Sequence, residues 1–179
     1  GKRIWFTTDG QMCLDTPFCA IERLLPHYCF HDGAEAYEFW GACWTTYNPY
    51  QYGWHAYIHQ SDQPGKHYWV RYPNGDGYLI YPGRPISHQG PVSSIRLEQA
   101  REGVEDYEYL YILREKLAKL PSASPAAAQA QTALQEAANL LRLPNPGGRY
   151  SSRLLPDPDR LLALRHLLAQ TIESLYAQP

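Results

Sequence analysis

Residues 72–83 read YPNGDGYLIYPG and residues 91–110 read PVSSIRLEQAREGVEDYEYL, and this stretch decides the fold. Asn-Gly and Asp-Gly steps tolerate positive φ and close tight hairpins. We therefore expect residues 67–72 and 78–81 to be strands that pair across the turn at residues 74–77. Ser93 or Ser94 then supplies the N-cap of a long helix. A hairpin that leads directly into a charged, tyrosine-rich helix is more particular than generic packing requires.

The long helix is predicted to have a wide apolar face. Its apolar residues recur at spacings of three and four, and they are Leu97, Ala100, Val104, Tyr107 and Tyr111, then Leu110, Leu113, Leu117 and Leu120. A stripe of this width is typical of a helix packed against a sheet. The charged side chains of Arg96, Glu98, Arg101 and Asp106 are expected to form a network that docks the helix against neighbouring loops.

The N-terminal third predicts one βαβ unit. RIWFTT (residues 3–8) and AYEFWGACW (residues 36–44) are rich in β-branched and aromatic residues, which favours two buried strands. Between them, Thr16-Pro17 is a typical helix start. We expect Pro26 to kink or break this helix and Gly33 to close it. A strand, a helix and a second strand in this order imply a parallel sheet.

The rest of the chain is expected to be loop and helix. Residues 45–65 are turn-rich and predict a long loop. Ser124-Pro125 opens an alanine-rich helix to about Leu141, residues 144–152 read as a linker, and Asp157-Pro158 starts the last helix. That helix carries one apolar face, made of Leu161, Leu164, Leu168, Ile172 and Leu175. The two helices are predicted to form a hairpin that covers the long helix.

The hairpin-and-helix stretch resembles the C-terminal signature of the glycoside hydrolase family 123 catalytic domain and its uncharacterised relatives, over residues 3 to about 120. The resemblance implies an α/β fold: the C-terminal part of a (β/α)8 barrel with an inserted β-hairpin, followed by an α-helical hairpin. RIWFTT would be the seventh strand and AYEFWGACW the eighth. Residues 1–120 would then form the barrel part, and residues 121–179 a helical extension packed on it.

Barrel active sites form at the C-terminal ends of the strands and in the loops that follow them. We therefore expect the substrate-binding residues to be Asp9, Trp40, Trp44, Tyr47 and Asp76. Indole and phenol rings can stack on a pyranose, while a carboxylate accepts sugar hydroxyl protons. Purely structural roles stay open: Trp40 can fill the barrel, Asp9 can cap a turn, and Asp76 can simply form its turn.

The resemblance also implies a reaction, in which the substrate's 2-acetamido oxygen attacks while an Asp orients it and an adjacent Glu donates the proton. No Asp-Glu dipeptide occurs in the chain, and Glu105-Asp106 has the reverse order on the long helix. No catalytic acid is therefore assigned here. The expected function is to line and support the sugar site of an enzyme acting on N-acetylhexosamine-containing glycans, with the remainder of the parent barrel as partner.

Other interpretations of the function of this chain remain open. The chain starts at Gly1, without an initiator Met and close to a strand, which suggests a piece of a longer protein. The family resemblance suggests secretion or a periplasmic location. One alternative is a non-catalytic carbohydrate-binding or structural module that holds a glycan on the aromatic loop 44–57. Another is an isolated fragment with exposed strand edges.

Composition excludes several classes of protein. A net charge of −2 and a pI near 6.4 show no excess of positive charge of the kind that binds nucleic acid or an anionic membrane. The 15 Tyr and 5 Trp suit both core packing and sugar stacking. Neither His27/His31 nor His55/His59 has a third ligand in its pattern, and Cys13, Cys19, Cys29 and Cys43 form no C-x-x-C pair, so we expect no metal and no cofactor.

Overall fold

The structure is a computed structural model that describes residues 2–7, 20–39, 41–43, 48–50, 55–60, 67–72, 75, 77–142 and 157–177. Within these residues the elements are β1 (Trp5–Thr7), α1 (Ala20–Asp32), β2 (Ala36–Glu38), β3 (His55–Gln60), β4 (His67–Tyr72), β5 (Ile80–Pro82), the 3-10 helix η2 (Arg84–Ile86), β6 (Pro91–Ser93), α2 (Ile95–Leu117), α3 (Pro125–Leu140) and α4 (Asp159–Tyr176).

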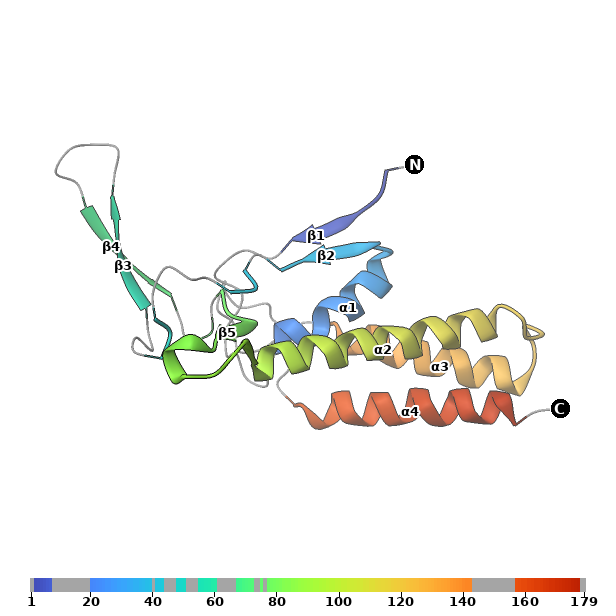
Figure 1. The fold of residues 1–179 in the computed structure, drawn as a ribbon. Coiled ribbons are helices and arrows are strands. Elements are labelled where there is room, and N and C mark those ends of the chain that lie inside the picture. Colours follow the sequence, from blue (N-terminus) through green and yellow to red (C-terminus); the bar gives the residue numbers. More distant parts are fainter. Residues whose placement is uncertain are drawn as a thin grey trace.

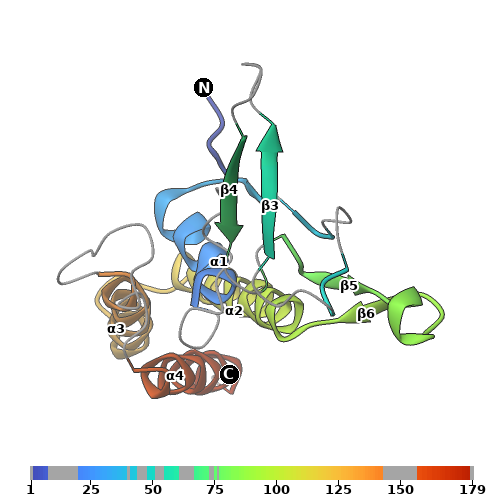
Figure 2. The same ribbon diagram turned by 90° about the vertical axis from the view of Figure 1, so that its left-hand side faces the viewer.

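The long helix α2 is the axis of the molecule (Figure 1). On one side it packs against α1, which in turn contacts β2, and on the other side it packs against α3 and α4. Figure 2 looks nearly along α2 and shows β5 and β6 on the side away from α3 and α4. The described residues thus form a helix-rich α/β arrangement with three small two-stranded sheets.

The predicted βαβ unit is present. β1 and β2 are parallel, with Trp5 opposite Ala36 and Thr7 opposite Glu38, and α1 connects them. The prediction of two buried strands over 3–8 and 36–44 is wrong in length and in burial, because each strand has three residues and Trp5 is 65% exposed. Within the described residues, α1 contacts β2, and β1 pairs with no strand other than β2.

Helix α1 contains Pro26 but is not broken there, contrary to one of the two expected outcomes. The residues around Pro26 are buried against α2, and this packing holds the helix together on both sides of the proline. The predicted closure at Gly33 is confirmed, because Gly33 has φ +69° and the N–H of Ala34 donates to the carbonyl of Cys29 at 2.9 Å. This is the geometry of a Schellman cap.

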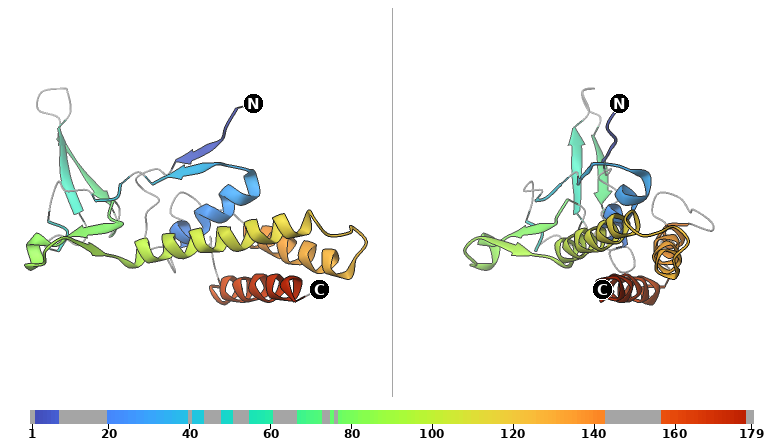
Figure 3. Two further views of the ribbon diagram at one scale, coloured as in Figure 1. Left: turned by 45° about the vertical axis from the view of Figure 1, so that its right-hand side comes forward. Right: turned by 90° about the vertical axis from the view of Figure 1, so that its right-hand side faces the viewer.

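The predicted hairpin is wrong in its pairing. β4 pairs antiparallel with β3, whose residues 55–60 were expected to be loop, and β5 pairs with β6 rather than with β4. The turn itself is real, because the N–H of Tyr78 donates to the carbonyl of Gly75 at 2.9 Å. The turn lies between the β3–β4 and β5–β6 hairpins and closes neither of them. Tyr78, which follows the turn, forms an antiparallel bridge with Cys43. Figure 3 shows the two hairpins diverging.

Helix α2 starts as predicted at Ser94, whose Oγ accepts the N–H of Leu97 at 3.2 Å. Its buried face is not the predicted one: Val104 is 46% and Tyr111 41% exposed. The buried positions are Arg96, Gly103, Asp106, Leu110 and Leu113. The first half of α2 thus turns glycine and charged side chains inward: Gly103 and Asp106 face α1, and Arg96 faces Tyr78 and Tyr81.

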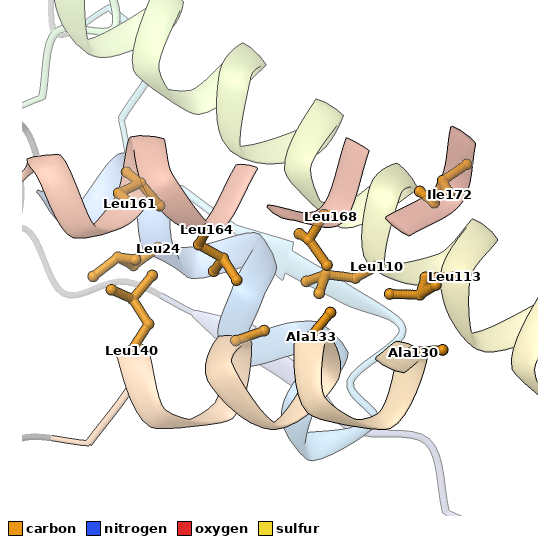
Figure 4. Packing of buried hydrophobic residues seen from close by; sticks show 11 residues of the cluster. Leu24, Leu110, Leu113, Ala130, Ala133, Leu140, Leu161, Leu164, Leu168 and Ile172 are labelled. Carbon is orange, nitrogen blue, oxygen red and sulfur yellow. The ribbon is translucent and has the colours of Figure 1, made fainter. Parts of the chain in front are cut away.

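The C-terminal helices confirm the predicted hairpin. Ser124 caps α3 by accepting the N–H of Ala127 at 3.1 Å, and α3 and α4 pack on each other and on α2. The leucine face of α4 meets the alanine face of α3 in a core shared with α1 and α2 (Figure 4). Its buried members are Leu24, Leu110, Leu113, Ala130, Ala133, Ala137, Leu140, Leu161, Leu164, Leu168 and Ile172. The predicted linker at 144–152 lies outside the described residues.

The contact between α1 and α2 depends on Gly103. A Cβ at this position would lie 2.5 Å from the carbonyl oxygen of Arg23 and 3.2 Å from Cγ of Pro26. We predict that Gly103→Ala lowers stability by about 1–3 kcal/mol, because the helices must separate. This loss outweighs the gain of about 1 kcal/mol that alanine brings to a helix interior. Thermal unfolding followed by circular dichroism measures the difference.

The matched control is Glu108→Ala, an exposed position on the same helix. We expect this substitution to change stability by less than about 0.5 kcal/mol. A Gly103→Ala protein as stable as the unmodified chain would contradict the close packing of α1 on α2.

Candidate functional site

The five predicted substrate-binding residues, Asp9, Trp40, Trp44, Tyr47 and Asp76, lie outside the described residues. The strand ends that precede them are described. Thr7 ends β1 and Glu38 ends β2, and the parallel register places them side by side. The Thr7 hydroxyl donates to Oε2 of Glu38 at 3.4 Å, and both groups are exposed. The C-terminal ends of the two strands therefore present a carboxylate and a hydroxyl to solvent.

Residues 41–43, which follow β2, contact residues 77–80, which precede α2. The N–H groups of Leu79 and Ile80 both donate to the carbonyl of Ala42 at 2.9 Å. A Cβ on Gly41 would lie only 3.0 Å from Cα of Gly77, so the two backbones touch. The N-terminal end of α2 is thereby held on the side of the fold toward which β1 and β2 point (Figure 3).

Three tyrosines and one arginine gather at this place, and we call them the tyrosine–arginine cluster: Tyr50, Tyr78, Tyr81 and Arg96. The rings of Tyr78 and Tyr81 are stacked, with centroids 5.2 Å apart and planes 16° apart. Tyr50 lies 5.7 Å from Tyr81 at an angle of 43°. Tyr78 is fully buried, Tyr81 is half-buried, and Tyr50 is 42% exposed.

Arg96 organises the cluster. Its Nε donates to the carbonyl of Tyr78 at 2.6 Å, its Nη2 donates to the Tyr81 hydroxyl, and its guanidinium carbon lies 5.3 Å from the centroid of the Tyr81 ring. Gly75 makes room for it: φ is +86°, and a Cβ there would lie 2.5 Å from Nη1 of Arg96. Glycine is therefore required at residue 75 both by its backbone conformation and by the approach of the guanidinium.

Sequence reasoning missed Tyr50 and Tyr81 as members of a site, and it assigned Arg96 to a different network. Tyr78 and Tyr81 lie three apart in YLIY, where the pattern indicates only a strand. Tyr50 lies in a segment that is distant in sequence from α2, so no local pattern connects it with Arg96. The one usable signal is the glycine-rich turn at Gly75 and Gly77, since glycines that permit close backbone approach often border a site.

A second group of polar side chains is buried between α1, α2 and α4, and we call it the buried ion cluster. Asp106 of α2, 1% exposed, accepts from Arg23 Nε at 2.7 Å and lies 3.2 Å from His27 Nε2. Arg165 of α4 lies 3.5 Å from the same carboxylate and also binds Glu102 and Glu105. The expected network of Arg96, Glu98, Arg101 and Asp106 is therefore confirmed for the Glu98–Arg101 pair but wrong for Arg96 and Asp106, which have other partners.

The difference has a geometric reason. Asp106 points into the helix interface, where its partners come from α1 and α4 instead of from loops. Arg101 stays on the exposed face and pairs with Glu98 and Glu102. The Glu105-Asp106 pair is thus divided between the surface and the interior, with Glu105 bound to Arg165 at 2.6 Å. Asp106 cannot reach a substrate from this position.

The charge of Arg165 is held by its partners. Burial alone lowers the pKa of Arg165, but the hydrogen bond to Glu105, the charge of Asp106 and the contact with Glu102 outweigh it. The net result is a pKa above the ordinary arginine value. Arg165 therefore remains a cation wherever the protein is folded, and the cluster stabilises the packing of α4 on α2.

The two histidine pairs lie on different kinds of element, His27 and His31 on α1 and His55 and His59 on β3. His27 faces Asp106, whereas the exposed His31 lies 2.8 Å from Asp32. His55 and His59 belong to β3, and residues four apart on a strand are separated by about 13 Å. Among the residues that the structure describes, no three His, Cys, Asp or Glu side chains are grouped so as to hold a metal ion.

Two of the four cysteines are described, and both are free thiols: Cys29, which is buried, and Cys43, which is half-buried. Cys13 and Cys19 lie outside the described residues. Burial raises the pKa of the Cys29 thiol, and the nearby Asp32 carboxylate raises it further. A thiol that stays protonated is a poor nucleophile, so Cys29 has the character of a core residue.

Comparison with known protein families finds a match over the middle of the chain. The family described as "Glycoside hydrolase 123, catalytic domain" matches residues 20–113, just over half of the chain. The matched range runs from the start of α1 into the second half of α2 and includes the tyrosine–arginine cluster. No curated protein matches the chain. None of the described helices has the length and apolar character needed to cross a membrane.

We predict that Asp106→Asn destabilises the protein by about 3–5 kcal/mol, because it leaves buried cationic partners without their carboxylate. Urea denaturation measures the change. Glu98→Gln is the matched control, since Glu98 is half-exposed and pairs with the exposed Arg101 at 3.3 Å. That pair is expected to contribute less than about 1 kcal/mol. Equal losses in the two variants would contradict the structural role of the buried ion cluster.

We also predict that Cys29 reacts with iodoacetamide more slowly than Cys43 in the folded protein. Because the folded-state pKa of Cys29 is raised, its thiol stays protonated at a pH where an unfolded thiol ionises. Its contribution to stability is present below the ordinary thiol pKa and is lost as the pH rises through the raised value. Peptide mass spectrometry after labelling at several pH values measures both rates. Slow labelling of Cys29 that persists in denaturant would refute burial as the cause.

Proposed function

Because the chain belongs to the glycoside hydrolase 123 catalytic-domain family, we propose that it is the C-terminal portion of a (β/α)8 barrel that hydrolyses N-acetylhexosamine-containing glycans. Its own role is to line and support the sugar site. The observation that carries the proposal is the parallel pairing of β1 and β2 around α1, of which α1 and β2 lie within the matched range. A strand, a helix and a parallel strand are the repeating unit of such a barrel.

The proposed sugar-facing residues are Asp9, Trp40, Trp44, Tyr47 and Asp76. Asp9 follows the end of β1 by two residues, and Trp40 follows the end of β2 by two. Asp76 stands between Gly75 and Gly77, next to the backbone that contacts Gly41. Substrate sites of barrel enzymes lie at the C-terminal ends of the strands, which supports this assignment. The exposed Thr7–Glu38 pair marks the same edge of the sheet.

The catalytic acid of the proposed reaction belongs to another part of the barrel. Hydrolysis of a glycoside needs a proton donor and a second group that acts on the anomeric carbon or orients the acetamido group. No Asp-Glu dipeptide occurs in the chain, and Asp106 is buried among cations. The parallel edge of β1 and β2 is where the remaining barrel strands would pair. The chain is therefore an enzyme only together with the rest of its parent domain.

A non-catalytic carbohydrate-binding or structural module is the alternative. It is favoured by the same missing dipeptide, together with the exposed ring of Tyr50 beside Tyr81. Such a module would hold a glycan without cleaving it.

The test compares the natural protein that contains these residues with the 179-residue chain alone. The substrates are the 4-methylumbelliferyl β-glycosides of N-acetylgalactosamine and N-acetylglucosamine. We expect the whole protein to release the fluorophore and the chain alone to release none, since the proton donor is absent from it. Hydrolysis by the chain alone would refute the assignment of the catalytic pair elsewhere. Glycan binding by the whole protein without any hydrolysis would favour the alternative.

A further inference from the structure

The tyrosine–arginine cluster has more order than packing requires. The three rings form a graded series from the interior outward: Tyr78 is 1% exposed, Tyr81 is half-buried, and Tyr50 is 42% exposed. Their centroids are 5.2 Å apart for Tyr78 and Tyr81 and 5.7 Å apart for Tyr81 and Tyr50. Of the three rings, Tyr50 is thus the one exposed to solvent, and the more buried Tyr81 and Tyr78 lie behind it.

The more buried part of the cluster, Tyr78 and Tyr81, is held in place by the buried charged side chain of Arg96. Arg96 is 4% exposed, and its fork reaches both the backbone carbonyl of Tyr78 and the hydroxyl of Tyr81. A buried guanidinium is costly and is retained where its directed hydrogen bonds are needed. Here these bonds fix both the position and the tilt of the Tyr81 ring.

The hydroxyl groups give the surface its polar chemistry. Since the Tyr81 oxygen accepts from Arg96, its own proton is directed elsewhere. The pKa of Tyr50 is raised, first by desolvation and then by the proximity of Tyr81 and Cys43. Tyr50 therefore stays a neutral phenol and a hydrogen-bond donor through the physiological pH range. Ring faces edged by neutral donors suit a pyranose, which has an apolar C–H face and equatorial oxygen acceptors.

We propose that Tyr50, supported from behind by Tyr81, forms an aromatic platform on which the apolar face of a pyranose ring stacks, and that Arg96 is the residue that positions this platform. The inference rests on the proposed function for the class of ligand, and it adds a sugar subsite made of residues other than the five proposed above. The platform lies beside residues 41–43, which follow β2, because Ala42 and Cys43 pair with residues 78–80.

The experiment measures binding of methyl N-acetyl-β-D-galactosaminide and methyl N-acetyl-β-D-glucosaminide to the natural protein by isothermal titration calorimetry. We expect Tyr50→Ala to weaken binding of the preferred sugar about tenfold, because it removes the stacking ring and its hydroxyl. Tyr50→Phe keeps the ring and is expected to stay within about threefold of the unmodified protein, having lost one hydrogen bond.

Tyr111→Ala is the matched control. Tyr111 is 41% exposed, nearly the same as Tyr50, and it lies on α2 about 22 Å along the helix from Arg96. We expect it to leave the affinity unchanged. Thermal unfolding of each variant establishes that the proteins compared are folded.

The positioning role of Arg96 is tested with Arg96→Lys, which keeps the charge but loses the fork. We expect it to weaken sugar binding by itself, and to add no further loss when combined with Tyr50→Ala. Such non-additivity is the signature of residues acting through one platform. Losses that simply multiply would show that Arg96 affects binding independently of Tyr50 and would overturn its positioning role.

The remaining outcomes separate the two proposals. Sugar binding that Tyr50→Ala leaves intact, or that Tyr111→Ala weakens equally, would overturn the platform and leave the proposed function standing. Absence of binding of either sugar to the unmodified protein would overturn the platform together with the sugar ligand of the proposed function.

Discussion

One buried carboxylate links three of the four described α-helices. Asp106 of α2 binds Arg23 and His27 of α1 and lies within reach of Arg165 of α4. A carboxylate that is 1% exposed needs such partners, and they need it in return. The charge pairs therefore set the position of α1 along α2, and Gly103, one turn earlier, sets how closely the two helices approach.

From this contact the rest of the arrangement follows along α2. Its middle holds α1, and with α1 the parallel pair β1 and β2 whose ends carry Thr7 and Glu38. Its C-terminal half joins the leucine and alanine core of α3 and α4. Its first turn carries Arg96, which holds Tyr78 and Tyr81. One helix thus places the strand ends and the tyrosine–arginine cluster on the same side of the fold.

Buried and exposed polar groups have different roles in this fold, and this difference agrees with the proposal that the chain supports a sugar site. The charged residues with the strongest mutual contacts lie in the helix interface, and they are committed to one another there. Among the described residues, the strand ends carry the exposed Thr7 hydroxyl and Glu38 carboxylate, and the tyrosine–arginine cluster exposes the ring of Tyr50. These groups suit the proposed role of binding and orienting a sugar, in a chain that belongs to a glycoside hydrolase family.

The sequence by itself determined the local features: the caps at Ser94 and Ser124, the end of α1 at Gly33, and the leucine face of α4. Each depends on residues a few positions apart, so the pattern carries the information. Tertiary structure alone decided that β4 pairs with β3, that the first half of α2 buries Asp106 instead of Val104, and that Arg96 meets Tyr81. Those outcomes depend on segments distant in the chain, because strand partners and counter-charges are chosen by what packing brings into contact.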